Sequence, residues 1–381
     1  MQQVIIGSLV AFFISFYAIP VIIHIANAKQ LVDIPNERKV HASPVPLLGG
    51  VGVFIGFILS LVISISFNVA SAESASYIAA FLIVFFLGLG DDIMILSPAK
   101  KFVGQFVASF ILIFKGHLLI TDLHGFLGIH TLNETASYIL TYFTLIGVIN
   151  AFNLIDGVDG LAASLGIISM AVFGTWFLIN NDIFFALMAF TLTGSFCAFL
   201  IFNFHPAKIF MGDAGSMLLG LANGILVIHF IQEAPSAETL ATTASPAVGF
   251  GVLLIPLMDT LRVFCLRISQ GRSPFSPDRK HIHHLFLDKG FSHRSTTITI
   301  ACVSLVFSVF SFAVDTWDST WIVLTQAGLF FIAIYLLHIF EPSVHLRVVQ
   351  NENGIIIQEN KVPRLVSFFS KKERTTAGDN N

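Results

Sequence analysis

Residues 183–204 read IFFALMAFTLTGSFCAFLIFNF and contain no Asp, Glu, Lys or Arg. An α-helix needs about 20 apolar residues to cross the hydrocarbon core of a bilayer, so this run predicts a transmembrane helix. Comparable apolar runs lie on either side of it. They are residues 3–27, 46–68, 76–90, 102–121, 137–150, 160–180, 210–232, 247–267, 297–315 and 321–341. We therefore expect an all-α polytopic membrane protein with about 11 transmembrane helices.

The composition of the whole chain agrees with that expectation. Of 381 residues, 55% are hydrophobic and 11% are charged, and the mean hydropathy is +0.84. These values exclude an ordinary soluble globular protein. No Lys or Arg precedes the first apolar run, and the run is longer than the core of a signal peptide, so we interpret it as a membrane helix.

The positive charges predict an orientation. Of the 20 Lys and Arg residues, 19 fall in loops, at a helix end or in the tail on one predicted side, and only Lys115 falls on the other. Positive residues are retained on the cytoplasmic side, so we expect an outside N-terminus and a cytoplasmic C-terminus. Residues 1–345 should form the transmembrane domain, and residues 346–381 a partly disordered cytoplasmic tail. Asn353-Gly354, flanked by apolar residues, predicts a small β-hairpin in this tail.

Carboxylates gather in three motifs at the predicted cytoplasmic ends of helices. The motifs are GLGDD at 88–92, followed by Lys101, NAFNLIDGVDG at 150–160, and FMGDAGS at 210–216. Adjoining acids such as Asp91 and Asp92 repel one another and require a cation or a shared proton. Glycines at 157 and 160 allow the backbone to approach a ligand closely.

The three motifs together favour a bound divalent cation. Clustered oxygen ligands suit Mg²⁺ or Mn²⁺ better than zinc. Each motif has a simpler explanation on its own: Asp91 and Asp92 as a solvated helix end, and Asp213 as a helix cap favoured by the dipole. A calcium loop at 150–160 would lack the EF-hand pattern.

Two further segments on the same side carry cations and histidines. In SPFSPDRKHIHH at 273–284, a helical conformation would put His281 and His284 on one face, where they and Arg279 can donate to phosphate oxygens. Zinc binding and a solvated loop are the alternatives, although no Cys or HExxH pattern accompanies the histidines. Near the N-terminus, Arg38, Lys39 and His41 are candidates for binding either a substrate phosphate or anionic lipids.

Carboxylates, a divalent cation, basic side chains and histidines on one face are the components of a phosphoryl-transfer site. A transporter or lipid flippase is the first rival, but its charged groups should lie near the membrane midplane. Asp259 is the one candidate for such a group, and we expect it near the cytoplasmic end of its helix. The second rival is a scaffold that has lost activity. We expect no nucleic-acid partner.

The four motifs, in this order and spacing, resemble those of the polyprenyl-phosphate N-acetylhexosamine-1-phosphate transferases, and within them the WecA type. The resemblance covers about residues 30–340. It implies transfer of a sugar 1-phosphate from a UDP-sugar to undecaprenyl phosphate, with release of UMP and a need for Mg²⁺ or Mn²⁺. It also implies a bacterial inner-membrane enzyme whose active site faces the cytoplasm.

The resemblance also implies roles for individual residues. Asn153, Asp156 and Asp213 would be metal ligands, Asp91 and Asp92 would orient or deprotonate the lipid phosphate, and Lys101 would neutralise the diphosphate. Phe210 would stack on uracil and Asp159 would hydrogen-bond its edge. The remaining candidates for contacts with the sugar and phosphates are Asn150, Arg279, His281, His283 and His284, and His281 is also a catalytic candidate.

UDP-GlcNAc is the expected donor, because SPFSPDRKHIHH differs from the histidine loop of the related enzymes that use UDP-MurNAc-pentapeptide. A deoxy or epimeric sugar would fit the same motifs. Direct displacement by the lipid phosphate is the expected mechanism, with a covalent aspartyl intermediate as the alternative. A homodimer and the downstream pathway are left open.

Overall fold

The computed structural model describes residues 1–33, 44–65, 74–273, 280–339, 343–351 and 354–362. The predicted site residues Arg38, Lys39, His41 and Arg279 lie outside these ranges, as does Asn353 of the predicted hairpin turn.

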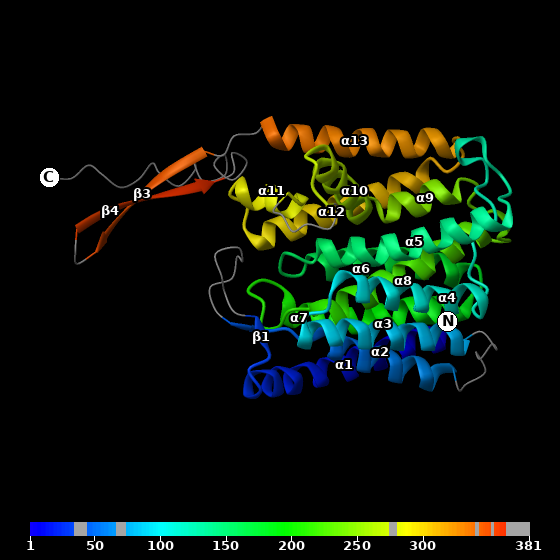
Figure 1. Cartoon of the computed structure of the whole chain (residues 1–381), viewed down its shortest axis with the longest axis horizontal. Helices are drawn as coiled ribbons and strands as arrows, with labels where there is room; N and C mark the ends of the chain where they lie inside the picture. The colour runs from blue at the N-terminus through cyan, green and yellow to red at the C-terminus, as the bar shows by residue number, and fades with distance from the viewer. Residues whose placement is uncertain (34–43, 66–73, 274–279, 340–342, 352–353, 363–381) are drawn as a thin grey trace.

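Most of the described chain is helical, and most of the long helices lie alongside one another (Figure 1). The α-helices are α1 (Gln2–Ala28), α2 (Gly49–Ile65), α3 (Ser74–Met94), α4 (Pro98–Phe114), α5 (Glu134–Ile155), α6 (Leu161–Ile179), α7 (Ile183–Asn203), α8 (Gly212–Glu233), α9 (Ser245–Val252), α10 (Leu254–Ser269), α11 (Ile282–Asp288), α12 (His293–Ala313) and α13 (Ser319–Ile339). Short 3₁₀ turns occur at Phe126–Gly128 and Ala234–Ser236.

Several helices begin at residues that satisfy their first backbone N–H groups. The side chain of Asn133 accepts from Ala136 N at 2.8 Å at the start of α5, and Ser292 accepts from Ser295 N at 3.2 Å at the start of α12. α4 begins at Pro98, which has no N–H to leave unpaired. The loops therefore carry local signals for where each helix begins.

Helix α8 lies at the centre of the bundle. It contacts α2, α3, α5 and α6, and 94% of its most apolar 18-residue stretch is buried within the protein. By contrast, α1 and α13 lie at the edge and expose large apolar side chains such as Phe13 and Tyr335. An apolar outer surface around a packed core is what a lipid environment requires.

The number of candidate spans is smaller than the 11 predicted runs. Eight described helices are long and apolar enough to cross a membrane, and the pair α9 and α10, bent by 79°, would make a ninth. The other two runs form α2 and α4, which have 17 residues each. At a rise of about 1.5 Å per residue, each is about 25 Å long, short of a typical hydrocarbon core.

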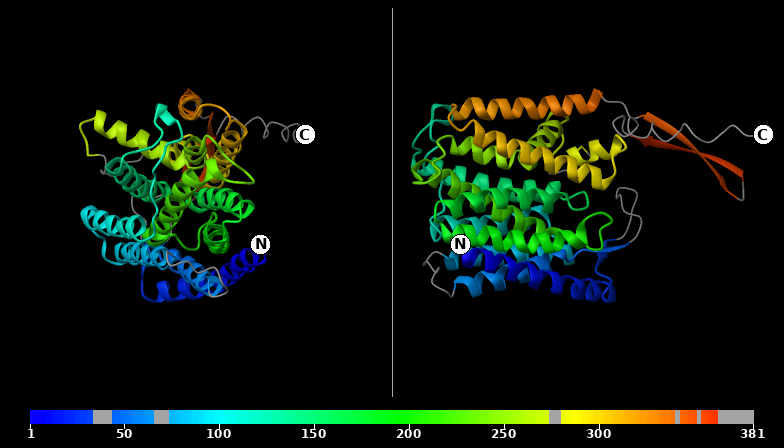
Figure 2. Two further views of the ribbon diagram at one scale, coloured as in Figure 1. Left: turned by 90° about the vertical axis from the view of Figure 1, so that its right-hand side faces the viewer. Right: turned by 180° about the vertical axis from the view of Figure 1, so that it is seen from behind.

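The polypeptide reverses direction between successive long helices, so the loops divide between two ends of the bundle (Figures 1 and 2). One end carries a two-residue antiparallel pair, β1 (Val32–Asp33) with β2 (Val45–Pro46), together with α11. Strands β3 (Ser343–Asn351) and β4 (Gly354–Val362) pair antiparallel beyond this end. The N-terminus lies at the other end. This arrangement brings together the ends of helices that carry the acidic motifs.

Candidate active site

Lys101 joins two of the three acidic motifs. Its Nζ lies 2.6 Å from Asp91 Oδ2 and 2.5 Å from Asp213 Oδ2. The end of α3, the first turn of α4 and the start of α8 thus meet at one ammonium group. Asp91 is further fixed by its Oδ1, which accepts a hydrogen bond from Leu96 N at 2.6 Å. All three side chains are partly exposed, so ligands can reach this ion cluster.

Asp92 has a different environment from its neighbour Asp91. Its two oxygens accept from the backbone N–H groups of Asp213 and Ala214, at 2.7 and 3.0 Å. These are orphan donors in the first turn of α8, where a carboxylate is also favoured by the helix dipole. The cap of α8 is therefore supplied by Asp92 from another helix, because Met211 at the N-cap position makes no side-chain capping bond. Asp92 holds Asp213 in place.

Glycines allow this close approach of three helices. A Cβ on Gly50 would lie 2.2 Å from Gly215 N, and one on Gly88 would lie 2.5 Å from Ala214 Cα. Gly212 adopts a left-handed φ of 70°, and a Cβ there would lie 2.6 Å from Asp92 Oδ2. Any larger residue would therefore displace the start of α8 from α2 and α3.

The backbone of the FMGDAGS motif is paired with the segment that leads into α2. Phe210 N donates to Pro46 O at 2.7 Å, and Gly49 N donates back to Phe210 O at 2.9 Å. Gly50 N donates to Met211 O at 2.8 Å. Phe210 is thus held beside the aspartate cluster, with its side chain half-buried.

The end of α5 supplies the amides of the second motif. Asn150 Nδ2 donates to Gln105 Oε1 at 2.9 Å and to Ile146 O at 2.7 Å. Asn153 Nδ2 donates to Ser216 Oγ at 3.0 Å, which leaves the amide oxygen as a ligand atom. Asn150 is therefore bound within the helix bundle, whereas Asn153 presents an oxygen next to α8.

Asp156 follows directly after α5 and is strongly affected by its surroundings. Burial, with the charges of Asp213, Asp92 and Asp159, raises the pKa of Asp156 to about 7. No hydrogen bond or cation among the described residues offsets these effects. An excess of carboxylate charge over cations, with the Asn153 oxygen nearby, fits a hard divalent cation.

Asp159 instead pairs with two histidines that the sequence motifs did not include. His205 Nδ1 lies 2.7 Å from Asp159 Oδ2, which also accepts from Ala207 N at 3.2 Å. His293 Nδ1 lies 3.6 Å from Asp159 Oδ1. Burial alone would raise the pKa of Asp159, but its interactions with His293 and His205 outweigh it and hold this pKa below its usual range.

These three side chains place one ligand atom each within 4.8 Å of one another. The close pair of Asp159 and His205 is already at hydrogen-bonding distance, and the two imidazole rings stack with centroids 4.9 Å apart. Within the described residues, this group is a second place that could hold a metal ion, distinct from Asn153, Asp156 and Asp213.

The histidine motif is only partly helical. α11 begins at Ile282, so His283 and His284 are in the helix and His281 precedes it in an extended conformation. His281 and His283 are buried. Burial, with the neighbouring His284, lowers the pKa of His283 to about 3. His283 is therefore neutral at physiological pH and brings no positive charge to the site.

The second motif and the histidine motif are in direct contact. A Cβ on Gly157 would lie 2.3 Å from His283 Nε2. The glycine expected to admit a ligand is thus closely approached by an imidazole of the protein itself. Thr297 Oγ1 also donates to Asp159 O at 2.8 Å. The loop after α5 is therefore held between α11 and α12.

Sequence reasoning missed four residues that organise this end of the bundle. They are Asn203, His205, Asp259 as a partner of the histidine motif, and His293. Asn203 is buried, accepts from Gly160 N at 2.8 Å and donates to Ile209 O at 2.9 Å. A buried amide at the end of an apolar run was a usable signal, because such groups are almost always hydrogen-bonded. The partners themselves lie too far apart in sequence for a local pattern to identify.

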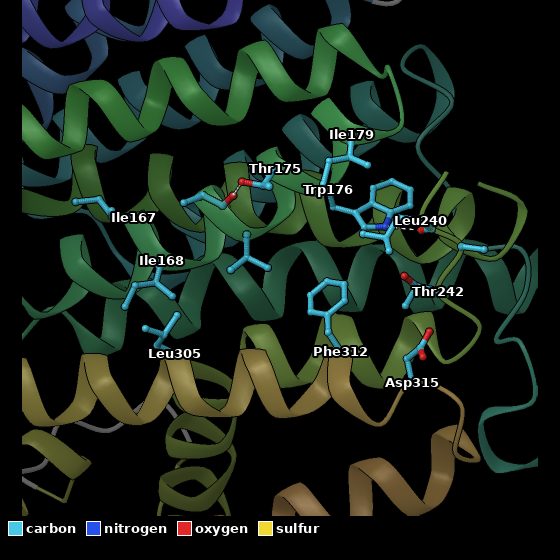
Figure 3. A pocket seen from close by; sticks show the side chains of 13 residues that line it. Ile167, Ile168, Thr175, Trp176, Ile179, Leu240, Thr242, Leu305, Phe312 and Asp315 are labelled. Atoms are coloured by element: carbon cyan, nitrogen blue, oxygen red, sulfur yellow. Dashed lines mark hydrogen bonds between the residues drawn. The ribbon is translucent and has the colours of Figure 1, made fainter. Parts of the chain in front are cut away.

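An apolar pocket of about 680 Å³ lies elsewhere, between α6, α12 and residues 240–242 (Figure 3). Its lining includes Ile168, Trp176 and Phe312, and Trp176 Nε1 donates to Leu240 O at 2.9 Å. None of the motif residues lines this pocket. Its lining is mostly apolar, with Asp315 as the one charged member, and the acidic and histidine motifs lie outside it.

Comparisons with known proteins agree with the arrangement of these motifs. Residues 74–231 match the model of glycosyl transferase family 4. The chain is 33% identical over 322 residues to the decaprenyl-phosphate N-acetylglucosaminephosphotransferase of Mycobacterium leprae, covering 79% of this chain and 81% of the relative. It is 31% identical over 361 residues to the probable undecaprenyl-phosphate N-acetylglucosaminyl 1-phosphate transferase of Bacillus subtilis, covering 92% and 94%.

A third relative is the undecaprenyl-phosphate alpha-N-acetylglucosaminyl 1-phosphate transferase of Escherichia coli O157:H7. It is 32% identical over 289 residues, covering 74% of this chain and 76% of the relative. Residues 74–231, which match the family model, include the helices that carry the aspartate, asparagine and lysine cluster. The chain therefore belongs to glycosyl transferase family 4, the polyprenyl-phosphate N-acetylhexosamine-1-phosphate transferases.

Proposed function

We propose that this enzyme transfers GlcNAc 1-phosphate from UDP-GlcNAc to undecaprenyl phosphate and releases UMP. The names of the Bacillus subtilis and Escherichia coli relatives support undecaprenyl phosphate as the acceptor. The mycobacterial relatives are named for decaprenyl phosphate, which is the second candidate acceptor. The three names share N-acetylglucosamine, which supports UDP-GlcNAc over a deoxy or MurNAc donor.

The observation that carries the proposal is the cluster of Asp91, Asp213 and Lys101 beside Asp156. Transfer of a phosphoryl group between two anionic substrates requires neutralisation of charge at the reacting phosphorus. A group of carboxylates with too few cations favours Mg²⁺ or Mn²⁺, held by Asn153, Asp156 and Asp213. When bound, the ion would neutralise the diphosphate oxygens.

The protein's own residues then have distinct roles. When the donor binds, Lys101 pairs with the diphosphate, and its ion pairs with Asp91 and Asp213 are weakened. Asp91 is left to orient the acceptor phosphate, and Asp92 keeps Asp213 at the start of α8 through its two backbone contacts. Phe210 stacks on uracil, and Asp159 and Asn150 contribute polar contacts to the nucleotide side of the site. Arg38, Lys39, His41 and Arg279 supply further phosphate contacts.

We propose direct displacement, in which an oxygen of the lipid phosphate attacks the sugar-linked phosphorus and UMP leaves. His281 and His284 stabilise charge on the transferred group. A covalent aspartyl intermediate is the alternative mechanism. Radiolabelled UDP-GlcNAc incubated with the enzyme in the absence of lipid distinguishes the two, because trapped label on the protein contradicts direct displacement.

The end of the bundle that carries the acidic and histidine motifs is called the motif end. The proposed orientation places it in the bacterial cytoplasm, with the N-terminus outside. It rests on the asymmetric distribution of Lys and Arg. Residues 1–345 then form the membrane-embedded domain, and residues 346–381 a cytoplasmic tail with a hairpin. In this orientation the active site meets a soluble nucleotide sugar and a membrane-bound lipid phosphate at the same surface.

The experiment that tests the function measures UMP release by the purified full-length protein in lipid nanodiscs with Mg²⁺. Undecaprenyl and decaprenyl phosphate are compared as acceptors, and UDP-GlcNAc, UDP-GalNAc and UDP-MurNAc-pentapeptide as donors. We expect release only with UDP-GlcNAc and a polyprenyl phosphate, and loss of release with EDTA. Release that continues in EDTA, or that prefers another donor, would contradict the proposal.

A further inference from the structure

Asp259 is the buried carboxylate for which the proposed reaction has no role. It lies in α10 and is completely buried. An unpaired charge in such a position would be strongly unfavourable, so the groups that Asp259 contacts indicate its role.

Each oxygen of Asp259 meets donors from the histidine motif. Oδ2 lies 2.8 Å from His281 Nδ1, and Oδ1 accepts from Ile282 N at 2.8 Å. Arg262 Nη2 donates to Oδ1 at 3.1 Å and also donates to Lys280 O. The carboxylate and its arginine thus hold both the main chain and the side chain at residues 280–282. This is the point where the histidine motif turns into α11.

These contacts determine which nitrogen of His281 carries a proton. A carboxylate accepts hydrogen bonds, so Nδ1 must be the donor. In a neutral imidazole the other nitrogen, Nε2, is then unprotonated, and in the charged form it becomes a second donor. In both states Nε2 is the nitrogen available to a substrate.

We infer that Asp259 is a positioning residue that fixes His281 with Nδ1 protonated and Nε2 directed to the transferred phosphate. The inference rests on the proposed function for its second part, the contact with phosphate. Its first part, the protonated Nδ1, rests only on the hydrogen bonds above. The buried acid therefore acts through an imidazole, as carboxylates do behind histidines in other active sites.

The substitution Asp259→Asn tests this arrangement at nearly constant volume. Two donors meet Oδ1 and one meets Oδ2, so the amide oxygen of the variant is expected to stay with Ile282 N and Arg262. Its NH₂ group then faces His281, which must accept at Nδ1 and carry its proton on Nε2. The tautomer of His281 is therefore expected to invert.

The measurement is ¹⁵N NMR of histidine-labelled protein in nanodiscs, with the His281 signals assigned by difference from His281→Gln. We expect protonated Nδ1 in the native protein and protonated Nε2 in Asp259→Asn, together with a fall in kcat of about 10–100-fold. Thermal unfolding of the variant shows whether it remains folded, and Asp259→Glu is expected to recover the tautomer and part of the turnover.

A control with the same two residue types is present at the other end of the bundle. Asp182 pairs with His229 Nε2 at 2.7 Å, far from the motif residues. Asp182→Asn makes the same chemical change to an aspartate and histidine pair and is expected to leave kcat and the His281 tautomer unchanged. An equal loss of turnover in this control would show that the effect of Asp259→Asn is structural, and would overturn the inference.

The remaining outcomes separate the inference from the proposed function. An inverted tautomer with unchanged kcat would overturn the role of His281 at the phosphate. Protonated Nε2 in the native protein would overturn the positioning role of Asp259 whatever the enzyme's substrate. Absence of UMP release from the native protein with all donors, alongside protonated Nδ1, would contradict the proposed function and leave the hydrogen-bond assignment intact.

Discussion

The two ends of the helix bundle both contain aspartate and histidine pairs, but the pairs differ in burial. At the motif end the side chains of Asp259 and His281 are 1% and 6% exposed. At the other end those of Asp182 and His229 are 29% and 19% exposed. Water can replace the partner of an exposed group at little cost, whereas a buried charge depends on its protein partners. Substitutions should therefore have large effects at the motif end and small effects at the other.

The largest effect is expected for Asp213→Asn, which removes one charge from the Lys101 cluster at almost constant volume. We expect turnover to fall by roughly 10³-fold or more, since charged groups at a phosphoryl-transfer centre contribute on this scale. UMP release measures the loss, and thermal unfolding in nanodiscs monitors the fold. Asp182→Asn serves as the control for the other end. Turnover within about threefold of the native value in Asp213→Asn would remove the contrast between the two ends.

A smaller loss is expected for Gly157→Ala. The added Cβ would approach His283 Nε2 to 2.3 Å, so the loop after α5 must move away from α11. A displacement of about 1 Å at a reacting centre lowers turnover by roughly 10²-fold. The double variant with His283→Ala should be no slower than His283→Ala alone, because the clash is then absent. Independent, additive losses would show that the contact between these two residues is not the cause.

The substitution Gly50→Ala tests the comparison of the two ends of the bundle through helix packing rather than through charge. Its Cβ would lie 2.2 Å from Gly215 N, a backbone atom that cannot move alone. We expect a loss of about 1–3 kcal/mol in stability and displacement of Asp213. Gly147→Ala in α5 is the matched control, since no atom lies within 4 Å of its added Cβ. It should stabilise the helix slightly. Equal melting temperatures for the two variants would contradict the close packing.

The pH dependence of ligand-free stability should be the smallest effect. The pKa of Asp156 is raised to about 7 in the folded protein from 3.8. The folded state is therefore favoured by protonation, and this contribution is lost as pH rises from about 4 through about 7. We expect EDTA-treated protein to melt a few degrees lower at about pH 8 than at about pH 5.5. Asp156→Asn should reduce this difference, and added Mg²⁺ should raise the melting temperature at the higher pH. An unchanged pH dependence in Asp156→Asn would assign the effect to other groups.

Much of the fold could be predicted from apolar runs alone, because each run that is long enough forms a helix wherever it packs. Each of the eleven runs became helical, with the 247–267 run broken into α9 and α10 at Leu253. The break and the limited length of α2 and α4 depend on tertiary packing, and hydropathy does not encode them. The family was also predicted correctly, since its motifs are long and occur in a fixed order.

The candidate site was predictable only for residues that belong to short sequence motifs. Asp91, Asp92, Lys101, Asp156 and Asp213 come together because the helices alternate in direction, which the charge distribution already implied. The partners of His281 and Asp159 were not predictable, because Asp259 and His293 are brought to them by the positions of α10 and α12. The difference between Asp91 and Asp92 also required the structure, since adjacent carboxylates look alike in a sequence.

The central position of α8 has a consequence for how the protein is made. The helix is apolar enough to cross a membrane, although 94% of its most apolar 18-residue stretch is buried inside the protein. During synthesis this segment must enter the membrane on its own hydrophobicity, before its later neighbours α9 and α12 have been made. Its polar Asn223, bound to Ser169 Oγ at 2.5 Å in the finished bundle, depends on α6 having been inserted earlier. The order of helices along the chain is therefore also an order of assembly. The helix that carries Asp213 enters the membrane when only some of the helices that finally pack against it are present.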